Sequence, residues 1–394
     1  MKYDFDKPVE RRGTDSVKYD LAGSLFGSDS LQPMWVADMD FEVPGFIREA
    51  IIRRAEHPVY GYTYRPRRFF ESAAAWLHRR HEWDVSPDAF SFSPGIVPAL
   101  NLIVMAFTEP GDRVVVQPPV YFPFFSAVTN HGRELVYNPL VNRDGKYGID
   151  FGHLEEQFRN GARMLFLCHP HNPVGRVWRR EELEQLAGLC TRYGILVISD
   201  EIHSDLLLFG NRHVPLASLG PEIADLTFTC ISPSKTFNLA GLYTSAVITL
   251  NQDLKKGYEQ VLDAVHVGGG SLFGQVAFEE AYTRGDEWLD QLIAYLEKNV
   301  AWLEAFTREQ IPGLTLSPLE ATYLAWLDFS FLGLDDDGLR RFVTEDAGLA
   351  LNDGPMFGPG GAQHQRLNFA TAGRELERAL VRLARAVRQV KSAS

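Results

Sequence analysis

The stretch Ser232-Pro233-Ser234-Lys235-Thr236-Phe237-Asn238 directly follows an apolar run, residues 226–231, that predicts a buried strand. Its lysine is surrounded by hydroxyl side chains at the point where that strand ends. A lysine taken alone is usually a surface residue. The significance of Lys235 therefore depends on what the sequence places at the ends of its other strands.

Apolar segments alternate with helical segments over most of the chain. Strands are expected at residues 89–93, 113–117, 134–137, 163–168, 195–199, 226–231 and 245–250, and helices at 46–55, 69–81, 96–107, 154–158 and 180–193. Nearly continuous apolar strands between helices are typical of a mainly parallel sheet that is covered on both faces. The sequence therefore predicts a large α/β domain with a mainly parallel seven-stranded sheet.

The pattern changes near residue 286. A long helix is expected at residues 287–310, strands at 322–328 and 365–369, and a closing helix at 375–390. Residues 1–45 contain Pro33 and Pro44 among scattered polar residues and are predicted to be irregular. We therefore expect an N-terminal arm (1–45) that joins a smaller α/β C-terminal domain (286–394), and a large domain (46–285) between them.

Composition narrows the class of protein. A net charge of −12 and a pI near 5.4 argue against a nucleic-acid-binding surface as the main function. No apolar run approaches the length of a membrane span, and the first residues show no secretory signal. The three cysteines have no CxxC spacing. We expect a cytoplasmic protein with no metal site and with neither nucleic acid nor membrane as a partner.

Other strand ends also carry residues suited to chemistry. Gly95 follows the first predicted strand of the sheet, Asn172 follows the strand at 163–168, and Asp200 follows the strand at 195–199. In an open α/β sheet, ligands bind beyond the carboxyl ends of the strands. With Lys235, four strand ends therefore predict one shared site.

The residue types at these ends match what pyridoxal 5′-phosphate (PLP) requires. Its aldehyde needs a lysine amine, which Lys235 would supply as a Schiff base. Its pyridine nitrogen needs a buried carboxylate to stay protonated, and Asp200 is the candidate. The α-carboxylate of an amino-acid substrate needs a bidentate arginine, for which we choose Arg366.

The remaining cofactor contacts can be assigned in the same way. Tyr121 would cover the ring, and the ring's 3′-oxygen would be bound by Asn172, with His203 as a further candidate. The phosphate would bind at a helix N-terminus and to hydroxyl groups. These phosphate contacts are expected from Gly95, Ile96, Val97, Ser232 and Ser234.

Each residue also has a plainer structural explanation. Asp200 could cap the following helix, Tyr121 could be a core aromatic, and Arg366 could form a surface ion pair. No single residue decides between function and structure. The ordered occurrence of all of them favours one shared site.

The motifs resemble the fold-type I PLP-dependent enzymes. They are SPGIVPAL (93–100), PPVYFPF (118–124), HPHNPVGRVW (169–178), SDEIHSDL (199–206), SPSKTFNLAGL (232–242) and RLNFA (366–370). Together with PMWVADMDF (33–41) and YGYT (60–63), they look like the MalY/PatB class of cystathionine β-lyases, or C–S lyases. Two departures from many aminotransferases point the same way: Tyr243 replaces an arginine and His203 replaces a tyrosine.

The resemblance implies an aspartate-aminotransferase-like fold and a homodimer with active sites at the subunit interface. Tyr62, with Tyr60 as second choice, would reach the PLP phosphate of the other subunit. Trp35 and Asp38 would lie near the substrate entrance. The small-molecule substrate would be an amino acid.

The expected reaction is β-elimination from L-cystathionine or a related cysteine S-conjugate, which gives a thiol, pyruvate and ammonia. Lys235 would remove the α-proton and Tyr121 would assist. An aminotransferase that acts on an L-amino acid would use the same residues and is the alternative. A regulatory binding protein is a further alternative, although no feature of the sequence identifies a surface for that role.

Overall fold

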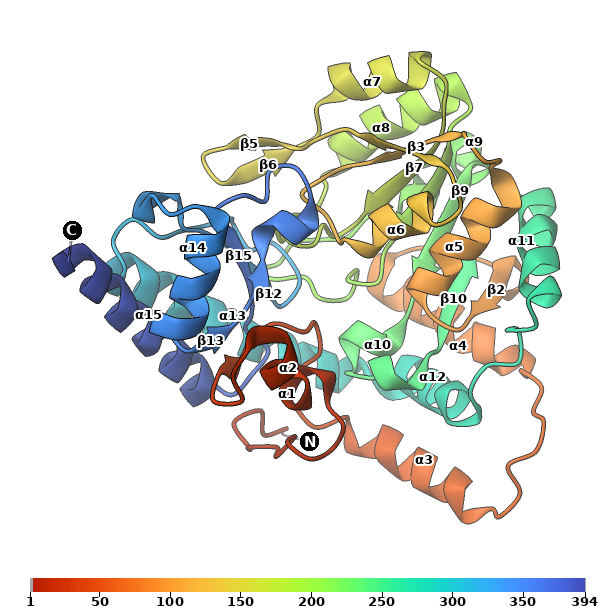
Figure 1. Cartoon of the computed structure of the whole chain (residues 1–394). Coiled ribbons are helices and arrows are strands. Elements are labelled where there is room, and N and C mark those ends of the chain that lie inside the picture. The colour runs from red at the N-terminus through yellow and green to blue at the C-terminus, as the bar shows by residue number, and fades with distance from the viewer. Residues whose placement is uncertain (1–2, 394) are drawn as a thin grey trace.

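The core of the protein is a seven-stranded sheet, drawn in Figure 1 from the computed structural model, which describes the backbone of residues 3–393 and the side chains of residues 3–390. The strand order is β2-β10-β9-β8-β7-β3-β4. Neighbouring strands run parallel except at β10, which is antiparallel to β2 and β9. The strands are β2 (Phe90–Ser93), β3 (Arg113–Val116), β4 (Glu134–Tyr137), β7 (Ala162–Cys168), β8 (Leu196–Asp200), β9 (Thr227–Ile231) and β10 (Ser245–Ile248). The predicted fold class is confirmed.

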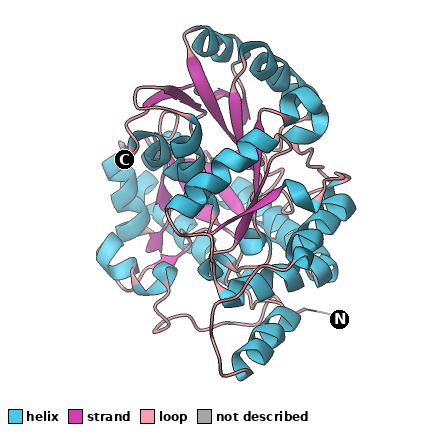
Figure 2. Cartoon of the chain, turned by 90° about the vertical axis from the view of Figure 1, so that its right-hand side faces the viewer, coloured by secondary structure: helices cyan, strands magenta, loops and turns pink. Residues whose placement is uncertain are grey.

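Helices cover both faces of this sheet (Figures 1 and 2). Successive strand residues point to opposite faces. On β7, Met164 and Phe166 belong to the apolar cluster that contains α5, whereas Leu165 and Leu167 belong to the cluster that contains α8. One face carries α5 (Ile96–Phe107), α6 (Pro123–Thr129) and α11 (Gln252–Ala264), and the other carries α7 (Phe151–Arg159), α8 (Arg180–Tyr193) and α9 (Pro221–Ala224).

Helix α8 shows how local sequence sets these bounds. The Glu182 carboxylate accepts a hydrogen bond from the backbone N–H of Arg179 at 2.9 Å and so caps the first turn. Gly194 ends the helix with a φ of 63°, a left-handed conformation that glycine adopts without a steric penalty. The predicted bounds of α8, residues 180–193, are those observed.

Three helices pack together at the edge of the sheet that carries β2. They are α3 (Gly45–Glu56), α4 (Arg67–His81) and α12 (Leu272–Arg284). The rings of Phe69 on α4 and Phe278 on α12 stack with their centroids 4.0 Å apart. Helices α3 and α4 were predicted from the sequence, whereas α6, α11 and α12 were not. Among residues 3–393, no helix combines the length and the apolar content needed to cross a membrane.

The C-terminal part has its own sheet. Its order is β11 (Thr315–Leu316), β12 (Leu324–Asp328), β15 (His364–Asn368) and β14 (Asn352–Asp353), with antiparallel pairing throughout. Two long helices, α13 (Asp286–Gln310) and α15 (Gly373–Ala393), pack against each other beside it, and α14 (Asp336–Arg341) lies before β14 in the chain. A separate hairpin is formed by β5 (Val141–Arg143) and β6 (Lys146–Gly148).

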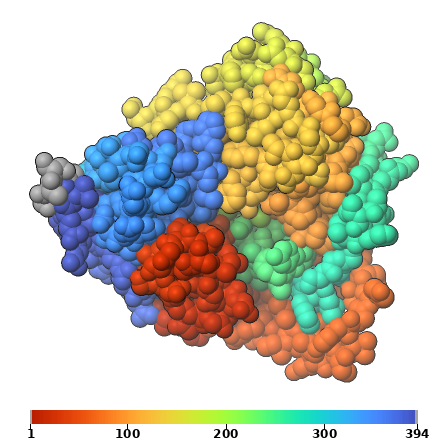
Figure 3. All heavy atoms as spheres, viewed as in Figure 1, coloured from red at the N-terminus to blue at the C-terminus, as the bar shows by residue number. Residues whose placement is uncertain are grey.

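The first 45 residues contain more structure than expected. Two short helices, α1 (Val17–Asp20) and α2 (Ala22–Phe26), precede β1 (Gln32–Pro33), which pairs in parallel with β13 (Leu349–Ala350). Helices this short leave little apolar periodicity in a sequence. Figure 3 shows this segment, in red, packed against the blue C-terminal part. The domain limits at residues 45 and 285 stay predictions.

Candidate active site

The predicted strand-end residues gather around one cavity. Its volume is about 220 Å³, and it lies where the sheet strands lead into residues 94–98, 200–203 and 232–235. Figure 3 shows the green segment around residue 240 recessed between the red N-terminal segment and the yellow and orange surfaces. Ten predicted residues line the cavity: Gly95, Ile96, Val97, Tyr121, Asn172, Asp200, His203, Ser232, Ser234 and Lys235.

Lys235 lies on the short helix α10 (Pro233–Thr236). The Ser232 hydroxyl accepts a hydrogen bond from the Ser234 backbone N–H at 3.2 Å and donates to the Thr244 carbonyl at 2.9 Å, so it fixes the start of this helix. The Lys235 amine donates to the Ala37 carbonyl at 2.6 Å. Burial lowers the pKa of Lys235 to about 8, a shift that the nearby Asp38 charge opposes.

Asp200 ends strand β8 and is 3% exposed. Its Oδ1 accepts a hydrogen bond from the Ile202 N–H at 3.2 Å. Burial raises the pKa of Asp200 to about 7. Within residues 3–390, no cationic side chain pairs with this carboxylate. A protonated ring nitrogen is the type of group that would complete it.

Another part of the cavity wall suits an anion. Helix α5 is 12 residues long, and Gly95, Ile96 and Val97 at its N-terminus line the cavity. The first N–H groups of a helix have no intrahelical acceptor, which favours a phosphate there. Thr244 and Ser245 also line this cavity and were not predicted from the sequence. Thr244 follows Tyr243 in a loop and Ser245 begins β10, so the pairing of β10 with β2 brings both residues here.

Tyr121 and His203 form further parts of the cavity wall. Burial raises the pKa of Tyr121 and lowers that of His203 to about 3, so both side chains are neutral at physiological pH. The His203 Nδ1 is buried and has no hydrogen-bond partner among the described residues. Its ring packs edge-on against the Tyr323 ring, with the ring centroids 6.1 Å apart. A buried, unpartnered ring nitrogen fits the expected contact with a ligand oxygen.

Arg366, on β15, is 3% exposed and is held by oxygen atoms. It donates to Asn172 Oδ1 at 3.1 Å, to the Trp35 carbonyl at 3.0 Å and to Asn352 Oδ1 at 2.6 Å. Its Nε is buried without a partner in the described part of the chain. Burial lowers the pKa of Arg366 to about 10, but the side chain stays protonated at neutral pH. A guanidinium with a spare donor suits a carboxylate.

Arg366 does not line the cavity itself but contacts the lining residue Asn172, and four further predicted residues also lie outside the cavity of this chain. Tyr60 and Tyr62 are 60% and 111% exposed on the loop between α3 and α4. The Trp35 ring donates to the Lys18 carbonyl at 2.9 Å, and only its own carbonyl reaches Arg366. Asp38 pairs with Arg11 at 2.6 Å. The roles of these four stay predictions.

Three residues near the cavity were not proposed from sequence. The Ala37 carbonyl accepts from Lys235 and also from the Tyr323 hydroxyl, at 2.9 Å. Asn368, inside the RLNFA motif, donates to the carbonyls of Val36 and Asp38, each at 2.6 Å. The role of the Ala37 carbonyl could not be predicted, because a backbone group leaves no signal in a sequence. Asn368 could have been proposed, because it lies two positions after Arg366 in the same motif.

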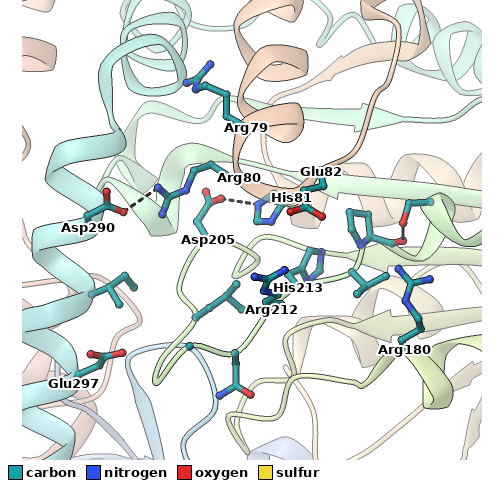
Figure 4. Close-up of a pocket in the computed structure, with 17 residues that line it drawn as sticks. Arg79, Arg80, His81, Glu82, Arg180, Asp205, Arg212, His213, Asp290 and Glu297 are labelled. Atoms are coloured by element: carbon teal, nitrogen blue, oxygen red, sulfur yellow. Dashed lines mark hydrogen bonds and ion pairs between the residues drawn. The ribbon is translucent and has the colours of Figure 1, made fainter.

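A larger cavity, of about 760 Å³, lies behind this site between α4, α13 and residues 205–215 (Figure 4). Charges of both signs line it, and Arg80 pairs there with Asp290 at 2.9 Å. At its inner wall Asp205 accepts from His81 at 2.9 Å and from the Thr236 hydroxyl at 2.8 Å. Since Thr236 adjoins Lys235, this wall supports the helix that carries the lysine.

Comparison with known proteins places the chain. The family model for class I and II aminotransferases matches residues 36–383. Cystathionine beta-lyase PatB of Bacillus subtilis (strain 168) is 46% identical over 96% of this chain and 98% of its own length. The chain belongs to the MalY/PatB family of C–S lyases. Protein MalY of Escherichia coli K12 is 31% identical over 99% of this chain and 100% of its own length.

Solved structures of similar proteins agree with this placement. The crystal structure of cystalysin from Treponema denticola, which contains a pyridoxal 5′-phosphate cofactor, matches with a TM-score of 0.95. Its sequence is 34% identical, and the match covers 99% of this chain and 100% of that one. The cavity described above has the donor set that such a cofactor needs: an amine, a buried carboxyl, an orphaned ring nitrogen and a helix N-terminus.

Proposed function

We propose that this chain is a PLP-dependent C–S β-lyase that cleaves L-cystathionine or a related cysteine S-conjugate to a thiol, pyruvate and ammonia. The observation that carries the proposal is that Lys235 and Asp200 line one cavity in a chain of the MalY/PatB family, and that Arg366 donates a hydrogen bond to Asn172, which also lines it. When bound, PLP withdraws electrons from the substrate α-carbon and so makes the α-proton acidic.

Lys235 is the residue that would move this proton. Its amine needs to be neutral to accept a proton from the α-carbon, and its lowered pKa of about 8 increases the neutral fraction near physiological pH. The Ala37 carbonyl, 2.6 Å away, would then accept a hydrogen bond from the ammonium form. The lysine would therefore act as the base and would be held beside the cavity while protonated.

The other residues would bind and orient. Arg366 would hold the substrate carboxylate, with Asn172 fixing one of its nitrogen atoms at 3.1 Å. Asp200 would keep a proton on the cofactor ring nitrogen, and Tyr121 would cover the ring. The N-terminus of α5 with Ser234 would bind the phosphate.

The overall reaction balances with one water. The Cβ–S bond breaks, the sulfur leaves with the electron pair and takes up a proton, and the remaining three-carbon fragment is hydrolysed to pyruvate and ammonia. No keto acid is consumed. This feature separates a lyase from an aminotransferase, which needs a keto acid as the amino acceptor.

The test is an incubation of the purified holoenzyme with L-cystathionine and no added keto acid. We expect pyruvate and free thiol to form in equal amounts. Turnover that depends on a keto acid and releases no thiol would contradict the lyase and identify an aminotransferase instead.

The second part of the proposal is a cytoplasmic homodimer with the active sites at the subunit interface. Tyr60, Tyr62 and Tyr64 expose 60%, 111% and 82% of their surface on one loop, which is unusual for neighbouring aromatic residues. Tyr62 of one subunit would reach the phosphate site of the other. The three cysteines are free and buried, as expected in a reducing compartment.

Light scattering should give twice the mass of the chain, and Tyr62→Phe should weaken PLP binding without changing that mass. A monomer with full lyase activity would exclude the shared site.

A further inference from the structure

The Arg366 guanidinium is buried but has no charged partner. Its oxygen acceptors are two side-chain amides, of Asn172 and Asn352, and the Trp35 carbonyl. The ring of Phe357 lies 5.0 Å from its central carbon and adds a π contact. Within the described side chains, residues 3–390, no carboxylate forms an ion pair with Arg366.

Another buried arginine in the same chain shows the usual arrangement. The Arg176 side chain is 2% exposed and pairs with Glu182 and with Glu320, each at 2.8 Å. A buried charge is costly without such a counter-charge, so pairing is the expected solution. Arg366 is nearly as buried as Arg176 and differs from it in receiving only neutral acceptors.

Asn352 lies next to Arg366, so the charge of the side chain at position 352 acts directly on the guanidinium. Asn352 on β14 and Arg366 on β15 are directly opposite each other in the antiparallel ladder. Side chains at such opposed positions lie within contact distance. The amide oxygen of Asn352 accepts from Arg366 at 2.6 Å. An aspartate has almost the same shape and would place a full negative charge at this point.

We propose that Asn352 is a positioning residue whose uncharged amide orients Arg366 and leaves its positive charge available for the α-carboxylate of the substrate. The inference rests on the proposed function, in which Arg366 binds that carboxylate. In this view, Asn352 helps the site to prefer amines that carry a carboxylate, because it keeps Arg366 free to bind that group. An acidic residue at position 352 would occupy the guanidinium from within the chain.

The decisive variant is Asn352→Asp in the PLP-loaded protein. L-alanine has no leaving group, so its binding, followed by the change in the visible absorbance of the cofactor, reports carboxylate recognition without elimination. We expect the dissociation constant of L-alanine to rise by about 30-fold, because an internal carboxylate competes for the arginine. In the protein without PLP, Tm should rise, on the order of 2 °C, because a buried charge gains a partner.

Two further variants make the result specific. Asn352→Leu removes the acceptor without adding a charge, and it should lower Tm and weaken L-alanine binding by less than Asn352→Asp does. Asn142→Asp makes the same chemical change on the exposed strand β5, where it should alter neither quantity. The KM for cystathionine should follow L-alanine binding, whereas kcat should change by less than about tenfold.

The outcomes separate this inference from the proposed function. If wild type binds L-alanine but forms no pyruvate from cystathionine, the lyase proposal fails and the role of Asn352 is still measured. If Asn352→Asp lowers Tm, or weakens binding no more than Asn352→Leu does, Asn352 is only structural. Wild-type protein that does not bind L-alanine would also overturn the inference.

Discussion

Asp200 and Asp205 lie in one short segment, and both are buried, but their surroundings are opposite. Asp200 accepts one backbone hydrogen bond, and burial raises its pKa to about 7. Asp205 accepts from Trp76, His81 and Thr236 at 2.8–2.9 Å, and these donors hold its pKa below the usual value despite burial. The Asp200 carboxyl group lies at a cavity with a single hydrogen-bond donor, whereas the Asp205 carboxylate has three donors from the chain.

This difference in hydrogen bonding distinguishes a carboxyl group suited to ligand binding from one that stabilises the fold. A carboxylate that the chain satisfies with three donors stabilises the fold and has little capacity left for a ligand. Burial of a carboxyl group without a paired cation costs desolvation free energy, and a cationic group on a bound ligand can offset that cost. Asp200 therefore belongs to the cavity, and Asp205 to the wall behind α10.

The largest effect is expected on the cavity side, from Lys235→Ala. Loss of the amine should abolish the visible absorbance of lysine-bound PLP and reduce lyase activity by more than about a thousandfold, because anchor and base are lost together. Absorbance spectra and pyruvate release measure both. Lys255→Ala, at a lysine that pairs with Glu259 in its own helix, is the control and should retain both. Substantial activity in Lys235→Ala would remove the lysine from the mechanism.

Asp200→Asn should change how stability depends on pH in the protein without PLP. The pKa of Asp200 is raised in the folded state, so its contribution is full below pH ~3.9 and is lost as pH rises to about 7. The difference in unfolding free energy, variant minus wild type, should therefore increase between these limits, by up to about 4 kcal/mol. Denaturant unfolding at several pH values measures it. A difference that does not vary with pH would mean that Asp200 is not perturbed.

Asp205→Asn should act on stability first. The amide can no longer accept from three donors as a charged group, so unfolding should become easier by about 2 kcal/mol. PLP should still bind, since Asp205 does not touch the expected ligand position. Thermal unfolding and PLP titration of the same sample distinguish the two effects. Loss of PLP binding with unchanged stability would reverse the assignment of the two aspartates.

Thr236→Val should have the smallest effect. It removes one hydrogen bond to Asp205 and preserves the shape of the side chain, so stability should fall by about 1 kcal/mol. If the wall holds α10 in position, kcat should also decrease by a few fold with KM unchanged. Steady-state kinetics beside thermal unfolding test this. An unchanged kcat would limit Thr236 to a role in stability.

Much of this arrangement could be predicted because it follows from local patterns. Most strands of the large sheet are largely apolar runs; Asp200 ends one strand, and Gly95, Asn172 and Lys235 follow three others. The rule that ligands bind at strand ends then brings these residues together without any knowledge of distances. Arg366 was found from its motif.

The parts that could not be predicted depend on contacts between distant segments. Asn352 lies on a two-residue strand, too short to show an alternating pattern, and its partner is set by the ladder. Ala37 acts through its backbone, and Tyr323 through a hydroxyl that meets it across 286 positions of sequence. Helix α12 shows no clear apolar stripe because its buried residues include Gly274 and Gln275, whereas the apolar residues Phe273 and Val276 are only partly buried.

The pairing of β1 with β13 has a consequence for the order of events during synthesis. Residues 32–33 leave the ribosome long before their partner strand, residues 349–350, and also before all strands of the large sheet. Until then the segment that carries Ala37 lacks this anchor, and the amine of Lys235 lacks a fixed acceptor. A nascent chain can therefore fold its large sheet well before it can complete its active site.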